Sequence, residues 1–128
     1  MEDTNLMNSL NLNIWNRKFN LPISYDWFED EEELLPAQKE AINLILNHNT
    51  IFDSVLSNVK TYVLKFIPSE HKIDNIFKYV IPQKIYVLRK EKPTFALFCD
   101  FKFDLEHGIA VLFENNKFLG VVSQDEVL

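Results

Sequence analysis

The chain has few of the residues that flexible or cross-linked proteins use. Its 128 residues include only 2 glycines and a single cysteine, Cys99. So little glycine is typical of a packed globule and not of a low-complexity chain, and a lone cysteine cannot form an internal disulfide. Cys99 falls on an apolar strand position, so we expect a buried small hydrophobe and not a reactive thiol.

Long apolar segments are also missing. No run approaches the roughly 20 residues that a membrane-spanning helix needs, and residues 1–10 lack the basic start and apolar centre of a secretory signal. We therefore expect a cytoplasmic protein without a membrane partner. The length and the 47% hydrophobic content suit one domain with a single core. We expect residues 1–11 to form a flexible tail and residues 12–128 to form the domain.

A basic excess is missing too, since the net charge is −6. This balance argues against nucleic-acid binding. One short segment carries the whole acidic excess: Asp26, Glu29, Asp30, Glu31, Glu32 and Glu33. Because this run precedes Pro36, its carboxylates suit the positive start of a helix; a surface for a basic protein partner and a metal site are the alternatives. The stretch from Lys60 to Lys92 holds eight basic and three acidic residues, so the molecule is a candidate electrical dipole.

The alternation of residue types along the chain predicts a sheet. Two-residue alternation predicts three consecutive strands in residues 93–128. Asn115-Asn116 is typical of a two-residue hairpin loop and would place Glu114 opposite Lys117. Both faces of these strands are largely apolar, which indicates a sheet covered by helices or by a partner.

Further strands are predicted earlier in the chain. Ordered structure is expected from Leu12, with two strands in residues 12–14 and 19–28, where Trp27 would be a core anchor. Another strand is predicted for residues 83–89, with Ile85 and Val87 on one face.

Helical periodicity occupies the middle of the chain. It predicts a helix over residues 36–49, a second one that Thr50 caps and Pro68 ends, and a short third one over residues 69–80. The first two helices should form a hairpin. We therefore predict an α+β domain, in which an antiparallel sheet of about five or six strands packs against a helical hairpin.

One cluster of side chains has the chemistry for catalysis. Carboxylates and an imidazole lie within eight residues, in Asp100, Asp104, Glu106 and His107. They suit a metal-dependent hydrolase, but the spacing is unspecific and no established motif accompanies it. Turns require the same residue types, so we expect architecture here, with no metal and no cofactor. Gln124-Asp125 should fold back against His107 or Gly108 as a polar lock.

These residues also carry a resemblance. The segment from Phe103 to Phe113, the Glu114-Asn-Asn-Lys117 turn and the terminal Gln124-Asp125 resemble small bacterial domains of unknown function, which end in Glu-His-Gly, a strand, a turn and Gln-Asp. Leu105 stands where such domains carry proline. Some of them are similar to immunity proteins of bacterial toxin systems. The resemblance marks Glu106, His107, Gly108, Gln124 and Asp125 as motif positions and implies no catalytic residue.

The leading hypothesis is a non-catalytic protein-binding module, in one version an immunity protein whose segment from Asp26 to Glu33 faces a basic toxin. Two alternatives stay open. One is the metal-dependent hydrolase, and the other is a homo-oligomer subunit that buries an apolar sheet face.

Overall fold

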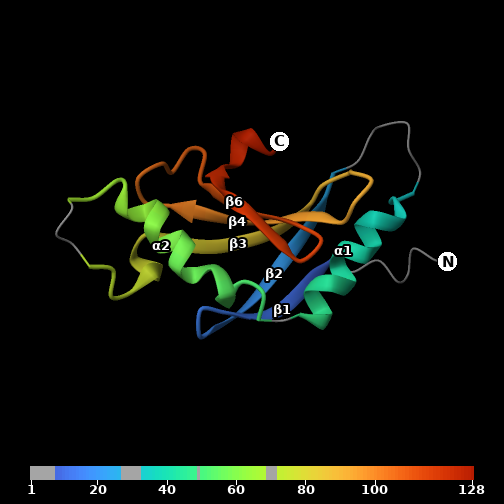
Figure 1. Cartoon of the computed structure of the whole chain (residues 1–128), viewed down its shortest axis with the longest axis horizontal. Helices are drawn as coiled ribbons and strands as arrows, with labels where there is room; N and C mark the ends of the chain where they lie inside the picture. Colours follow the sequence, from blue (N-terminus) through green and yellow to red (C-terminus); the bar gives the residue numbers. More distant parts are fainter. Residues whose placement is uncertain (1–7, 27–32, 49, 69–71) are drawn as a thin grey trace.

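The computed structural model describes residues 8–26, 33–48, 50–68 and 72–128, and it shows one six-stranded sheet with two helices on one face (Figure 1). The strands lie in chain order across the sheet, and only β2 and β3 run parallel. The predicted α+β class and the mostly antiparallel sheet are confirmed. The strands are β1 (Ser9–Ile14), β2 (Arg17–Tyr25), β3 (Val80–Val87), β4 (Thr94–Phe101), β5 (Ile109–Glu114) and β6 (Lys117–Ser123).

The first two strands form a tight hairpin. Trp15 and Asn16 make its turn with positive φ angles of 53° and 70°, the conformation that two-residue hairpin loops adopt. The strand β1 begins at Ser9, three residues before the expected start of order, because Leu10 is needed in the core and is 2% exposed. Trp27, the expected core anchor, lies outside the described residues.

The first helix, α1 (Pro36–Asn47), lies where the periodicity predicts it. The second, α2 (Leu56–Leu64), begins later than expected, after a 3-10 turn, η2 (Asp53–Val55). The prediction that Thr50 caps it is wrong, because α2 begins at Leu56 with Val55 as its N-cap residue and has no side-chain cap. The Asp53 carboxylate accepts a hydrogen bond from the Trp15 amide (2.6 Å) and ties this segment to the first hairpin. The helix α1 packs against β3 and β4, and α2 packs against β6.

The predicted third helix is wrong. Within residues 72–80 there is a single 3-10 turn, η3 (Ile76–Lys78), and the Asn75 side chain accepts a hydrogen bond from the Phe77 amide at its start. The strand β3 takes over at Val80 and continues through Pro82. Pairing with β2 starts only at Ile85, so the proline, which has no amide hydrogen, lies outside that ladder.

The core fills the space between the helices and one face of the sheet. In β4, alternate residues from Phe95 to Phe101 point into this core, while Ala96 and Phe98 point to the opposite face. Phe52, just before η2, packs edge-on against Phe95 at 6.3 Å between ring centroids. The helices thus cover one apolar face. Among the described residues, no helix is long and apolar enough to cross a membrane.

Candidate functional site

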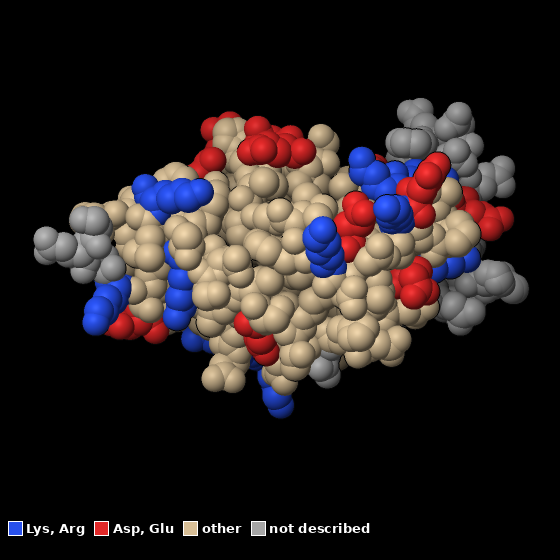
Figure 2. All heavy atoms as spheres, in the orientation of Figure 1, with Lys and Arg blue, Asp and Glu red and all other residues tan. Residues whose placement is uncertain are grey.

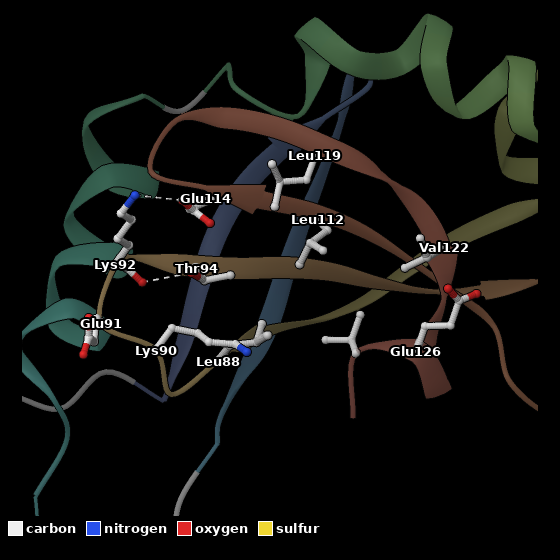
Figure 3. Close-up of a pocket in the computed structure, with 11 residues that line it drawn as sticks. Leu88, Lys90, Glu91, Lys92, Thr94, Leu112, Glu114, Leu119, Val122 and Glu126 are labelled. Atoms are coloured by element: carbon white, nitrogen blue, oxygen red, sulfur yellow. Dashed lines mark hydrogen bonds and ion pairs between the residues drawn. The ribbon is translucent and has the colours of Figure 1, made fainter.

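The second apolar face of the sheet has much less cover. Ala96, Phe98 and Ala110 are buried there under partly exposed side chains, and the C-terminal turn η4 (Gln124–Glu126) is followed by Val127, which packs on them. Beside this turn lies a groove of about 680 Å³ (Figure 3). It is lined by Leu88, Lys90, Glu91, Lys92, Thr94, Leu112, Glu114, Leu119, Val122, Glu126 and Val127.

A β-bulge in β6 shapes the groove floor. Leu112 pairs with Gly120, whereas Phe113 pairs with Phe118, so Leu119 is an extra residue with no partner in β5. Bulges at sheet edges redirect side chains. The bulge lets Phe118 face the main core while Leu119, which is 47% exposed, lines the groove.

The groove combines an apolar floor with a charged rim. Leu112 and Val122 are half-buried on its floor. On the rim, Lys92 Nζ lies 3.7 Å from Glu114 Oε2 (Figure 3). The Thr94 hydroxyl donates a hydrogen bond to the Lys92 carbonyl at 2.8 Å, which holds the rim loop against the sheet. Such a surface suits the binding of a partner with apolar side chains and charged neighbours.

The Gln124 part of the predicted polar lock is present at the C-terminal end of the sheet, whereas His107 is exposed and Asp125 accepts a hydrogen bond from Ser123. The Gln124 side chain donates from Nε2 to the carbonyls of Cys99 (3.0 Å) and Ile109 (3.3 Å). Gly108 makes room for it: a Cβ built on this glycine would lie 2.5 Å from Gln124 Nε2 and from the Cys99 oxygen. The lock joins β4, β5 and η4, and η4 forms one wall of the groove.

His107 lies at the surface of the same connection. Its Nδ1 is 3.1 and 3.2 Å from the two Asp104 carboxylate oxygens, and its backbone amide donates to the same carboxylate. The hydrogen bond that the His107 ring donates to Asp104 is the main reason that the pKa of His107 is raised, and the charges of Asp104, Asp125 and Glu106 add to it. The hydrogen bond from Ser123 is the main reason that the pKa of Asp125 is lowered.

The four residues considered for catalysis do not converge. Asp100 accepts a hydrogen bond from Gln83 at 3.0 Å, away from the pair formed by Asp104 and His107. The nearest Glu106 oxygen is 3.9 Å from His107 Nε2. Within the described ranges, no group of three or more His, Cys, Asp or Glu side chains is arranged to hold a metal ion. The hydrogen bonds between Asp104 and His107 hold the conformation of the connection between β4 and β5.

Only two members of the acidic run, Asp26 and Glu33, lie within the described residues. The first turn of α1 contains no acidic residue; instead, the Gln38 side chain accepts a hydrogen bond from the Leu35 amide at 2.9 Å. The Asp26 amide donates to the Val87 carbonyl, and the Glu33 carbonyl accepts from Arg89. Both described ends of the run are therefore anchored beside the groove residue Leu88. Glu29, Asp30, Glu31 and Glu32 lie outside the described residues.

Cys99 is fully buried on the core face of β4. Burial raises the pKa of its thiol, and the nearby Asp100 carboxylate raises it further. Because the thiolate is the nucleophilic form, this thiol is inert in the folded protein. The prediction of a buried small hydrophobe is confirmed.

Fold and site together define a class: an α+β domain built on one mixed sheet, with helices on one face and a groove on the other. The chain belongs to the family described as domain of unknown function (DUF6985), whose family model matches residues 7–128. No curated protein and no solved structure matches it. The predicted resemblance to a family of uncharacterised domains is confirmed, and the match covers almost the whole chain.

No sequence pattern predicts the groove. Glu114 is predicted only as a hairpin residue, and Leu88, Leu119 and Val127 belong to no motif. One signal was available, since the apolar residues on both faces of the last three strands indicate that the face without helices needs cover.

Proposed function

We propose that this domain is a non-catalytic protein-binding module and that the groove is its docking site. One observation carries the proposal: the sheet face without helices exposes an apolar floor with a charged rim. Exposed apolar surface bordered by polar residues is typical of sites where proteins meet. The groove lining contains no histidine and no cysteine, and its one hydroxyl, on Thr94, is bonded to a backbone carbonyl.

The acidic run supports a basic partner. Its described ends, at Asp26 and Glu33, are bonded to Val87 and Arg89 on either side of the groove residue Leu88. A partner seated in the groove would therefore lie near Asp26 and Glu33. Opposite charges across an interface speed association.

One version of the proposal is an immunity protein, since some of the domains that the chain resembles are similar to such proteins; the partner would then be a toxin with a basic surface. That version predicts an association rate that falls steeply with salt. Replacing residues 29–33 with Gln or Asn should slow association and flatten its salt dependence, while the groove contacts persist. An unchanged rate and salt dependence would remove the electrostatic version and leave the groove untouched.

The groove is tested by site-specific photo-crosslinking in cells of the native host. A photoreactive phenylalanine analogue at Leu119 should give a discrete adduct, whereas the same analogue at Leu46, an equally exposed leucine of α1, should not. Leu119→Glu should abolish binding of the identified partner, and Leu46→Glu should preserve it. Absence of an adduct at position 119, or equal adducts at both positions, would reject the groove as the docking site.

A further inference from the structure

A second surface lies at the opposite end of the sheet from the hairpin loop of β5 and β6. Three aromatic rings stack there: Phe66, after α2; Phe103, in the connection between β4 and β5; and Tyr79, before β3. Ring centroids are 6.1 Å apart between Phe66 and Phe103 and 5.9 Å apart between Phe103 and Tyr79. Buried Phe101 contacts Phe66 and Phe103 edge-on at 5.0 and 5.5 Å, which fixes both rings. We call this surface the aromatic tip.

The aromatic tip exposes large apolar side chains. Phe66 is 45% exposed, Phe103 is 39% exposed, and Leu105, two residues further along the same connection, is 77% exposed. Single exposed apolar residues are ordinary, but a group of them on adjoining segments marks an interaction surface. The groove lies on other residues, so the tip is separate from the site proposed above.

Lysines border the rings. Lys65 Nζ lies 5.4 Å from the Tyr62 ring centroid, and Lys102 Nζ lies 5.6 Å from that of Tyr79. Lys60 and Lys78 add charge on the same two segments. Basic and acidic side chains both border the uncharged surface near the left end of the molecule (Figure 2). This end therefore carries several lysines together with carboxylates, in a chain whose net charge is −6.

Two carboxylates share the connection with Phe103. Asp104 and Glu106 both face His107, at 3.1 and 3.9 Å from its ring nitrogens. The Asp104 carboxylate also accepts the His107 backbone amide, so it serves to fold the loop. Lys65 follows α2 and Lys102 starts the connection, and their Nζ atoms lie over the half-buried rings of Tyr62 and Tyr79.

We propose that the aromatic tip binds the surface of an anionic lipid bilayer. Phe66, Phe103 and Leu105 enter the headgroup region, and the lysines contact the phosphate groups. Aromatic rings and lysines are the residues that concentrate at membrane interfaces, and each lysine near an anionic surface adds attraction. A bilayer requires no shape complementarity, which suits a surface of projecting side chains. The groove remains free for a protein partner while the tip is bound.

The test is co-sedimentation of the full chain with vesicles. Vesicles of equal parts phosphatidylcholine and phosphatidylglycerol should bind the protein, and pure phosphatidylcholine vesicles should bind it far less. Leu105→Glu should weaken binding at least about tenfold, since it removes an apolar contact and adds a repelled charge. Lys65→Glu with Lys102→Glu should weaken it similarly. Leu46→Glu and Lys39→Glu, exposed on α1, are the matched controls and should bind as the unmodified chain does.

Leu105→Glu is chosen because the Leu105 side chain is 77% exposed and lies outside the core, and circular dichroism checks that the variant is folded. The proposal is overturned if the anionic vesicles do not bind, or if Leu105→Glu binds them as tightly as the unmodified chain. A protein that binds the tip and is lost with Leu105→Glu, while vesicles stay unbound, would also overturn it. Leu119→Glu tests the groove separately, so the two proposals fail independently.

Discussion

The side-chain amide of Gln124 donates a hydrogen bond to the backbone carbonyl of Cys99 at 3.0 Å and thereby fastens the C-terminal turn to the end of β4. The same amide reaches the Ile109 carbonyl in β5. One side chain thus holds the turn that forms a wall of the groove. The motif positions Gly108 and Gln124 therefore form a tight joint, in which the Gln124 side chain connects the C-terminal turn to β4 and β5 beside Gly108.

Gly108→Ala should lower the free energy of unfolding by about 2–3 kcal/mol. Gly108 has a φ of +63°, which side chains rarely adopt, and the new Cβ would lie 2.5 Å from both the Cys99 oxygen and Gln124 Nε2. Gln124→Ala should cost about 1–2 kcal/mol. Urea denaturation measures both values.

The double variant separates the two causes. Adding Gln124→Ala to Gly108→Ala removes one clash, so the two losses should sum to less than their independent total. Gly120→Ala is the control for backbone strain alone, because its φ of +156° is also one that side chains rarely adopt, whereas nothing lies within 4 Å of its added carbon. A loss at Gly120 equal to that at Gly108 would contradict the idea of a tight joint.

His107 should stabilise the loop only while it is protonated. Its pKa in the folded protein is raised above 6.5, chiefly by the hydrogen bond that its ring donates to Asp104. A raised pKa contributes stability that is fully present below the unfolded-state value and is lost as the pH rises through the folded-state value. His107→Gln should therefore lower the melting temperature in acid and leave it nearly unchanged in alkali.

Melting temperatures of His107→Gln, measured at pH values below and above 6.5, check the prediction. The control is His48→Gln, at an exposed histidine just after α1. A destabilisation by His107→Gln that is constant with pH, or greater in alkali, would contradict the ion pair.

Cys99 should be unreactive in the folded protein. It is fully buried, and burial raises the pKa of its thiol. Because the chain has a single cysteine, a disulfide reagent should report no thiol until denaturant unfolds the protein, and labelling should then follow unfolding. Cys99→Ala with Leu46→Cys, which carries an exposed thiol, should label at once. Fast labelling of the folded native chain would show that β4 opens locally.

Gln38 should be among the most sensitive polar residues in the chain. It is 0% exposed, its Oε1 accepts hydrogen bonds from Leu35 and Arg89, and its Nε2 donates to the Asp26 carbonyl. Gln38→Leu keeps the size but removes the partner of the Leu35 amide and of the Asp26 carbonyl and one partner of Arg89, which should cost about 2–4 kcal/mol. Exposed Gln83→Leu should cost about 0.5 kcal/mol or less. Similar losses in denaturation would contradict the bridging role.

Most of the secondary structure follows from local pattern. The strands β4, β5 and β6 alternate, α1 has a 3.6-residue period, and the Asn115-Asn116 turn places Glu114 opposite Lys117 as predicted. The local sequence pattern gave a wrong prediction where tertiary contacts determine the secondary structure. Residues 76–80 have helical spacing, but a single 3-10 turn forms there because Val80 is required to pair with Phe101.

The candidate site was only partly predictable for the same reason. That Gln124 would meet Gly108 followed from adjacent strands ending together. Leu119 as a groove residue did not follow, because Phe118 and Val122 have the same parity in sequence yet lie on opposite faces. A bulge changes the side-chain alternation, and no local sequence pattern predicts this one. The functional roles of the groove and of the aromatic tip stay predictions.

Alternation and composition determined that this chain forms a mostly antiparallel α+β sheet with one core, because the burial of apolar side chains depends on periods of two and 3.6 residues that the sequence displays directly. Tertiary structure alone decided that β2 and β3 run parallel, that Gln38 bridges three segments and that one sheet face keeps an open groove. These features arise from contacts between residues far apart in the chain, and such contacts have no period to read.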